Sequence, residues 1–325
     1  MALMLCDAKT DDCGRELAQH GCAQFPVACY HDDLTGTPVP WHWHTELEVL
    51  VVSEGTAVVA AGTQRFILWQ GEGAFVNSGV LHAAWSHGQP VCRLHSAVFH
   101  PRLVGGGPDS IFWTGYLQPL IEAQRQECVC FDGSELWHRE AVQAVEAAWI
   151  SCAQEPPGYE FWTRDALSRL VFLLSSHQPD TRMPRSGKAL REEGRVKLML
   201  EYIRSHYTSE LSTAAIAHSA MVSESECLRC FRSIIGQTPI QYVIQYRVQK
   251  AAELLSASEL SVSEIGARCG FQDASYFSKT FRTLKGCAPS EYRKKIAERA
   301  RRLLPQEAAQ AADREGTWGG AAKHS

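Results

Sequence analysis

The C-terminal third of the chain carries the same set of residues twice, at a constant offset of 50 positions. The first copy contains Phe231, Gly236, Pro239 and Tyr242, and the second contains Phe281, Gly286, Pro289 and Tyr292. An internal repeat indicates one structural unit that is used more than once. Because only two copies are present, the sequence predicts a pair of small helical units rather than a long solenoid.

The second copy shows how one unit would fold. Apolar side chains before Gly270 recur three and four positions apart, as one face of a helix requires. Gly270 suits the positive φ of a turn, and the Asp273 carboxylate can cap the next helix. Phe277, Phe281 and Leu284 would form the buried side of that helix. Two short helices joined by such a turn predict a helix-turn-helix, whose second helix can enter the major groove of DNA.

The region Val196–Lys294 resembles the AraC/XylS family of bacterial transcription regulators. The resemblance rests on three motifs that occur in the family's order: Gly270-Phe271, Ser275-x-Phe277-Ser278-x-x-Phe281 and Gly286-x-x-Pro289-x-x-Tyr292-Arg293. It implies a DNA-binding domain at 195–295 with helix-turn-helix units at about 213–234 and 262–284. A helix starting at Pro239 would connect the units, so that one chain could read two successive major grooves about 34 Å apart.

In this family the second helix of each unit reads DNA. The DNA-binding residues that the resemblance implies are Ser223, Ser225, Glu226, Arg229 and Arg232 in the first unit, and Gln272, Ser275, Tyr276, Ser278, Lys279 and Arg282 in the second. The first copy departs from the family pattern at Glu226, where an aromatic residue or histidine is frequent. Glu224 and Glu226 also disfavour phosphate contact at the start of that helix.

The charge is distributed unevenly along the chain. Residues 1–178 carry nine basic and 20 acidic side chains, whereas residues 195–295 carry 14 basic and nine acidic ones. A cationic domain gains affinity for DNA by releasing counterions from the phosphates. No secretory signal is recognisable, and no apolar run approaches the ~18 residues of a membrane span. We therefore expect a cytoplasmic protein that binds double-stranded promoter DNA and no membrane.

Residues 23–105 have the pattern of short strands separated by turns, which predicts a small β-barrel. Two motifs there resemble those of cupins: Gly36-x5-His42-x-His44-x3-Glu48-x6-Gly55 and Gly71-x5-Asn77-x-Gly79-x2-His82-x3-Ser86. Asn77 and Ser86 replace the proline and asparagine that are usual in the second motif. The resemblance implies a cupin-like barrel, a fold that also serves as the sensor domain in many AraC/XylS regulators.

The cupin resemblance leaves two kinds of ligand open. The residues expected to bind an effector are Trp41, His42, Trp43, His44, Glu48 and His82. In metal-binding cupins, the four ligands would be His42, His44, Glu48 and His82, a set that suits Zn²⁺, Fe²⁺ or Mn²⁺. Polar groups that line a small barrel can equally hydrogen-bond an organic effector. We expect a small-molecule effector and no obligatory cofactor, with a divalent metal as the open alternative.

The remaining segments complete the expected domain organisation. Residues 1–22 form an N-terminal extension, 179–194 a linker and 296–325 a disordered tail. The helical region 106–178 carries apolar stripes, which we expect to form a homodimer interface; the alternative is that they cover the barrel of one subunit.

The fold class that we expect is α+β multidomain, with a cupin-like barrel plus helices followed by an all-α double helix-turn-helix. The function is that of an effector-controlled transcription regulator, with RNA polymerase as a further partner. The alternative is a metal-dependent cupin enzyme with an attached helical module. The sequence shows no separate acid–base or nucleophilic constellation, so no catalytic residue is expected.

Overall fold

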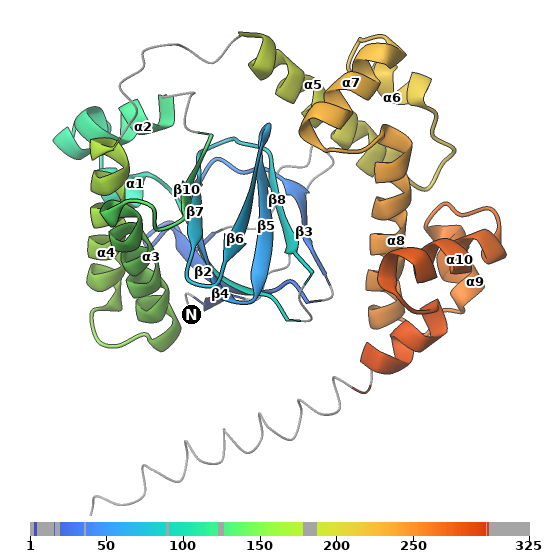
Figure 1. The fold of residues 1–325 in the computed structure, drawn as a ribbon, viewed down its shortest axis with the longest axis horizontal. Helices are drawn as coiled ribbons and strands as arrows, with labels where there is room; N and C mark the ends of the chain where they lie inside the picture. The colour runs from blue at the N-terminus through green and yellow to red at the C-terminus, as the bar shows by residue number, and fades with distance from the viewer. Residues whose placement is uncertain are drawn as a thin grey trace, which may run out of the picture. The chain divides into compact units, whose positions relative to one another are not determined.

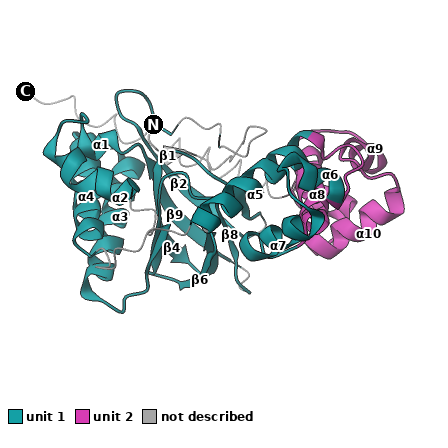
Figure 2. Ribbon diagram, turned by 90° about the horizontal axis from the view of Figure 1, so that it is seen from above, with its two compact units in different colours: residues 1–205, 214–237 teal, residues 206–213, 238–325 magenta. Residues whose placement is uncertain are grey.

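A computed structural model describes residues 3–4, 16, 20–35, 37–88, 91–122, 127–177, 187–296 and 298. The chain divides into two compact units (Figure 2): unit 1 comprises residues 1–205 and 214–237, and unit 2 comprises residues 206–213 and 238–325. Most of the expected N-terminal extension, residues 179–186 of the expected linker and nearly all of the expected tail lie outside the described residues. Among the described helices, none is both long and apolar enough to span a membrane.

Two sheets build the barrel of unit 1 (Figure 1). The six-stranded sheet has the order β1 (Leu3–Met4), β2 (Val27–Asp33), β9 (Arg93–Phe99), β4 (Leu47–Glu54), β7 (Gly73–Val76) and β10 (Cys128–Phe131). The four-stranded sheet has the order β3 (Val39–His42), β8 (His82–Ser86), β5 (Thr56–Ala61) and β6 (Gln64–Trp69). All strand pairs are antiparallel except β1 with β2. The expected α+β class is confirmed, and β10 adds a strand beyond the expected barrel limit at residue 105.

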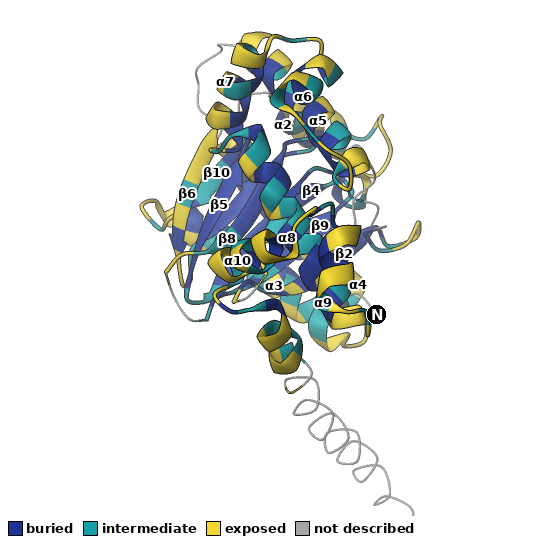
Figure 3. Cartoon of the chain, turned by 90° about the vertical axis from the view of Figure 1, so that its right-hand side faces the viewer, coloured by how far each residue is buried: buried dark blue, intermediate teal, exposed yellow. Residues whose placement is uncertain are grey.

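The strand β4 explains how one sheet separates two cores. Successive side chains on a strand point to opposite faces. Leu50 and Val52 therefore join the apolar cluster inside the barrel, whereas Val49 and Val51 pack into the cluster on the outer face. The continuous apolar run in β4 is the sequence signature of a strand buried on both faces, and its burial is visible in Figure 3.

Helices cover the outer face of the six-stranded sheet (Figure 1). They are α1 (Arg102–Gly105), the π-helical turn η1 (Trp113–Leu117), α2 (Gln118–Glu122), α3 (Leu136–Gln154) and α4 (Tyr159–Ser176). The antiparallel pair α3 and α4 supplies most of the buried side chains that meet the sheet, among them Val145, Leu167 and Leu170. Turn glycine Gly158, at φ 79°, begins α4.

Unit 1 also contains the first helix-turn-helix. Its helices are α5 (Gly187–His206), α6 (Thr213–Ser219) and α7 (Glu224–Ile234). The Ser223 hydroxyl caps α7 by accepting a hydrogen bond from the Glu226 amide, with 3.3 Å between Oγ and N. Helix α5 begins at Gly187, within the stretch expected as a linker up to residue 194. The charged residues of this stretch suggested an exposed linker. In the structure, however, Glu192 and Glu193 form ion pairs and are buried within a helix.

Unit 2 contains the second helix-turn-helix. Its helices are α8 (Pro239–Ala257), α9 (Val262–Arg268) and α10 (Ala274–Lys285). Gly270 has φ 84°, and the Asp273 carboxylate accepts from the Tyr276 amide over 2.6 Å, so both local predictions are confirmed. Phe277 and Phe281 are fully buried. Leu284, expected in the same stripe, is 41% exposed, because α10 ends one residue later and the chain turns away.

Candidate functional site

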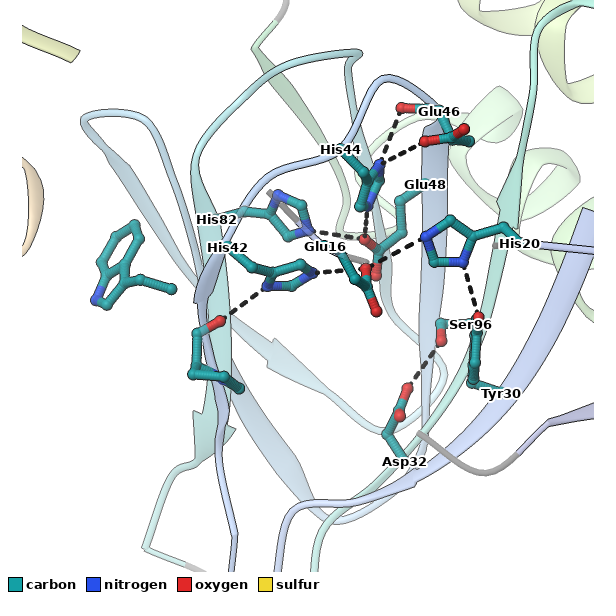
Figure 4. A network of polar contacts seen from close by, with 12 residues as sticks. Glu16, His20, Tyr30, Asp32, His42, His44, Glu46, Glu48, His82 and Ser96 are labelled. Carbon is teal, nitrogen blue, oxygen red and sulfur yellow. Dashed lines mark hydrogen bonds and ion pairs between the residues drawn. The ribbon is translucent and has the colours of Figure 1, made fainter. Parts of the chain in front are cut away.

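Four polar side chains meet inside the barrel of unit 1 (Figure 4). His42 ends β3, His44 follows it, Glu48 lies on β4 and His82 begins β8. One ligand atom from each residue lies within 4.8 Å of the others, and all four residues are buried. The pairing of β3 with β8 places His42 opposite His82, with ring centroids 4.1 Å apart. The structure therefore brings together the four residues that the cupin resemblance implies.

Backbone carbonyls orient the three imidazoles. His42 Nδ1 lies 2.8 Å from the Pro40 carbonyl oxygen, and His82 Nδ1 lies 2.8 Å from that of Val80. His44 Nδ1 similarly contacts its local backbone at 3.2 Å. A ring that donates from Nδ1 presents its Nε2 lone pair on the opposite side. The Nε2 atoms of His44 and His82 both point at Glu48 Oε2, at 3.0 and 2.8 Å.

The charges in this cluster perturb the protonation of its members. Burial alone would lower the pKa of His82, but the Glu48 carboxylate raises that pKa above its ordinary value. Burial would raise the pKa of Glu48, but His82 and His44 together hold it well below its ordinary range. Burial, reinforced by His82, lowers the pKa of His42 well below its ordinary value. The lowered pKa of His42 favours the neutral form of its imidazole.

This donor set fits a divalent cation. Three imidazoles with backbone-bound Nδ1 atoms and one ionised carboxylate are the ligand types that Zn²⁺, Fe²⁺ and Mn²⁺ accept. Fixed Nδ1 hydrogen bonds are the usual support of metal-binding histidines. His42, His44, Glu48 and His82 would hold such an ion, and it would supply a positive charge to a buried anionic ligand.

Two further residues of the site were missed by the sequence analysis. Glu16 Oε2 lies 3.6 Å from His42 Nε2 and 3.3 Å from His20 Nε2. His20 Nδ1 contacts the Tyr30 hydroxyl at 2.7 Å (Figure 4). Both residues belong to the expected N-terminal extension, and the only local signal was their spacing of four positions. Their approach to the barrel depends on contacts far along the sequence, which no local pattern encodes.

The two tryptophans of the first motif make different contacts. The Trp41 carbonyl accepts a hydrogen bond from the Arg204 guanidinium of α5. Lys197 Nζ lies 4.8 Å from the centroid of the Trp43 ring, a cation–π contact. The structure thus joins the three histidines and Glu48 into one cluster, while the contacts of Trp41 and Trp43 lead to α5.

The residues expected to read DNA lie on two separate helices. On α10 and its preceding turn, Gln272, Ser275, Tyr276, Lys279 and Arg282 are exposed, and Ser278 is half-buried. On α7 and its cap, Ser223, Ser225, Arg229 and Arg232 are exposed, and Glu226 is half-buried. The opposite faces of these helices carry the buried residues, among them Phe231 and Phe281. Each of these two helices is therefore amphipathic, with one polar and one buried side.

Comparison with known proteins identifies both regions. A family profile described as an AraC-like ligand binding domain matches residues 24–139, and one described as a helix-turn-helix domain matches residues 216–295. The chain is 27% identical over 285 residues to the uncharacterized HTH-type transcriptional regulator YdeC of Bacillus subtilis (strain 168), which covers 86% of this chain and 96% of YdeC. It is 25% identical over 257 residues to the HTH-type transcriptional activator RhaS of Klebsiella pneumoniae (strain 342). That match covers 78% of this chain and 87% of RhaS. An AraC-type regulator structure from Chromobacterium violaceum is 29% identical with a TM-score of 0.31, covering 32% of this chain and 93% of that chain.

Proposed function

Because this chain belongs to the AraC family of DNA-binding transcription regulators and is not an enzyme, we propose that its buried His–Glu cluster is the effector site. The cluster of His42, His44, Glu48 and His82 carries this proposal, because it lies inside the region that matches a ligand-binding domain. Buried polar groups that converge in a barrel are the usual recognition elements for a small molecule. The effector is a small polar molecule that hydrogen-bonds the imidazoles.

A divalent cation is the second candidate for this site. It is favoured by the inward-facing Nε2 atoms of His44 and His82, which both meet one oxygen of Glu48. In that case the metal is itself the signal, or it binds an anionic group of the organic effector. Either ligand stabilises the folded chain, by about 2.7 kcal/mol at a concentration of 100 times its dissociation constant.

The test is a thermal-shift titration of the full-length chain with Zn²⁺, Fe²⁺ and Mn²⁺ separately, and with a panel of polar metabolites. We expect at least one ligand to raise the melting temperature, and the His42→Ala/His44→Ala variant to lose that response. The matched control is His87→Ala, which removes an exposed imidazole elsewhere on unit 1. A response that persists in the double variant would place the effector outside this cluster.

Contacts within unit 1 give the effector a route to α5, which lies beside α7 in the same unit. The Glu193 carboxylate of α5 accepts from the Leu81 amide at 3.0 Å, directly before His82. Lys197 of α5 donates to the Gly79 carbonyl and pairs with Glu193 at 3.0 Å. A ligand shifts regulation only if it binds two arrangements of the protein with different affinity. We propose that the position of α5 distinguishes these arrangements.

The polar face of α10 is the proposed DNA surface of unit 2. Lys279 and Arg282 would make its charged contacts, with Gln272, Ser275, Tyr276 and Ser278 beside them. Replacing a residue that reads a base costs ~1–3 kcal/mol and relaxes specificity at one position. The proposal extends to α7 in unit 1, through Ser223, Ser225 and Arg232, whereas the expected contact Glu226 is engaged by Arg195 and Arg229. Arg229 lies on the same helix but is engaged by carboxylates.

We further propose a homodimer formed through α4 and its neighbour η1. Large apolar side chains are exposed there: Phe161 is 78%, Trp162 62% and Phe172 54% exposed. Exposed apolar groups that gather on one face mark an interaction surface. Sedimentation of the wild-type chain and of Trp162→Glu provides the test. A wild-type dimer that becomes monomeric in the variant supports this surface, and a variant that stays dimeric contradicts it.

We also propose that the protein acts in the cytoplasm and contacts RNA polymerase. A regulator bound at a bacterial promoter acts where transcription starts, which brings it to the polymerase and to the compartment that holds the chromosome. In vitro transcription from a bound promoter, with purified polymerase as the only other protein, measures this interaction directly. An unchanged transcript level at saturating regulator would contradict it.

A further inference from the structure

The recognition helix α7 carries an arginine that is bound by two carboxylates of its own chain. Arg229 Nη2 donates to Glu192 Oε1 at 2.7 Å and to Glu226 Oε1 at 2.7 Å. Arg229 Nε donates to Glu226 Oε2 at 3.0 Å. Glu226 lies one turn earlier on α7, and Glu192 lies on α5. All three residues belong to unit 1.

These hydrogen bonds occupy the N–H donors with which an arginine side chain recognises DNA. An arginine has five N–H donors, and bidentate recognition of guanine or of a phosphate needs two that are parallel. The edge formed by Nε and Nη2 is occupied by Glu226. The other edge is formed by Nη1 and Nη2. It needs the second hydrogen of Nη2, which is already donated to Glu192. Arg229 therefore has no parallel pair of donors left for a base or a phosphate.

The arrangement is held from the carboxylate side as well. Glu192 is only 8% exposed. Besides Arg229 it pairs with Lys188, whose side chain is mostly exposed and whose Nζ lies 3.9 Å from Glu192 Oε1. Releasing Arg229 would leave a buried carboxylate poorly paired, which is unfavourable. Glu226 is also bound by Arg195 at 2.8 Å, so its position is fixed independently of Arg229. The hydrogen bonds with Glu226, and to a smaller extent with Glu192, raise the pKa of Arg229 above its ordinary value.

The second recognition helix provides an internal comparison. The offset of 50 positions makes Lys279 the counterpart of Arg229, and Tyr276 the counterpart of Glu226. In the part of the chain that the structure describes, no carboxylate pairs with Lys279. Unit 2 thus presents its basic residue freely at the position where unit 1 neutralises its own.

We propose that Glu192 and Glu226 withhold Arg229 from DNA and act as an internal counter-charge on the first recognition helix. The inference rests on the proposed function, in which α7 faces DNA. The first helix-turn-helix then binds DNA without Arg229, and release of Arg229 adds one cationic contact. Glu192 is a positioning residue here, because it acts only through Arg229.

The experiment measures binding of the full-length chain to a mixed-sequence 30-base-pair duplex by fluorescence anisotropy at several salt concentrations. One added phosphate contact steepens the slope of log affinity against log salt by ~0.9, which is about fivefold in affinity at 0.15 M salt. We expect this gain in Glu192→Gln and in Glu226→Gln. Arg229→Ala alone removes no phosphate contact, so it should leave the salt slope unchanged, and it should abolish the gain when combined with either substitution.

The matched control is Glu224→Gln, which removes a negative charge from the exposed side of α7 without touching Arg229. An equal gain in this control, or a gain that persists with Arg229→Ala, would mean a general charge effect and overturns the proposal. So would a loss of affinity in Glu192→Gln, which would show that the carboxylates instead hold Arg229 ready for DNA. If Glu192→Gln fails to fold, by circular dichroism, the more exposed Glu226→Gln decides.

The same assay separates this proposal from the proposed DNA surface. Lys279→Ala/Arg282→Ala must weaken binding if α10 contacts DNA. An unchanged affinity in that variant contradicts the DNA surface as a whole. Weakened binding in that variant, together with no gain in Glu192→Gln or Glu226→Gln, contradicts only the withholding of Arg229.

Discussion

The substitution Phe281→Ala tests whether the second helix-turn-helix is held together as the structure indicates. The Phe281 side chain is fully buried, and its ring centroid lies 5.8 Å from that of Phe277 and 5.4 Å from that of Tyr292. Truncating a core phenylalanine costs ~3–5 kcal/mol, because apolar burial is lost and a cavity remains. Whole domains are stable by only ~5–15 kcal/mol, so this loss removes a large share of the total.

The expected change in melting temperature follows from the size of the unit. For a domain of 60–100 residues, 1 kcal/mol corresponds to about 4–8 °C. Phe281→Ala should therefore lower the melting transition of unit 2 by at least about 12 °C, measured by scanning calorimetry on the full chain. DNA binding should fail at temperatures where the wild-type chain still binds.

The matched control for this prediction is Leu284→Ala on the same helix. Leu284 is 41% exposed, so its truncation leaves no closed cavity and should shift the transition much less. Equal shifts in the two variants would refute the argument, because they would show that burial does not decide the cost. A Phe281→Ala chain with wild-type stability would refute the placement of this side chain.

Three further predictions concern the same domain. Lys279→Ala should weaken DNA binding, and a lower salt slope in gel-shift titrations would identify a phosphate contact. Asp273→Ala removes the cap of α10 and should cost ~1 kcal/mol in thermal unfolding. Gly266→Ala places a methyl carbon 2.8 Å from the Phe277 ring and should cost ~1–3 kcal/mol by overpacking. Gly194→Ala, which meets no atom within 4 Å, is the control and should not destabilise the chain.

Local signals made much of this fold predictable. Helix caps, turn glycines and apolar spacing act within a few residues, and they correctly located Asp273, Gly270 and the buried Phe281. The cupin-like motifs named the four residues of the cluster, although His44 lies beyond the end of β3, so strand alternation alone does not explain why His42 and His44 point the same way. Leu284 was misjudged because periodicity alone does not show where a helix runs out of neighbours to pack against.

The features that were missed all depend on partners distant in sequence. The pairing of Glu16 with His42 spans 26 positions, and that of Glu192 with Arg229 spans 37. Composition suggested a linker at Glu192, since carboxylates are seldom buried unless they are paired. The partner that made burial possible was already recognised, but as a DNA-binding residue. A basic residue in a recognition helix can therefore be predicted to contact DNA only when the carboxylates that surround it in the fold are known.

The energies of these contacts indicate how small a change would link the barrel to DNA binding. Coupling between an effector site and a DNA site is typically ~1–3 kcal/mol. One hydrogen bond contributes ~0.5–1.5 kcal/mol net, so altering two or three is sufficient. Glu193 bonds to the Leu81 amide beside His82, and the adjacent Glu192 bonds to Arg229. Opening the apolar core between sheet and helices would cost far more, so the polar contacts of α5 have the appropriate magnitude for regulation.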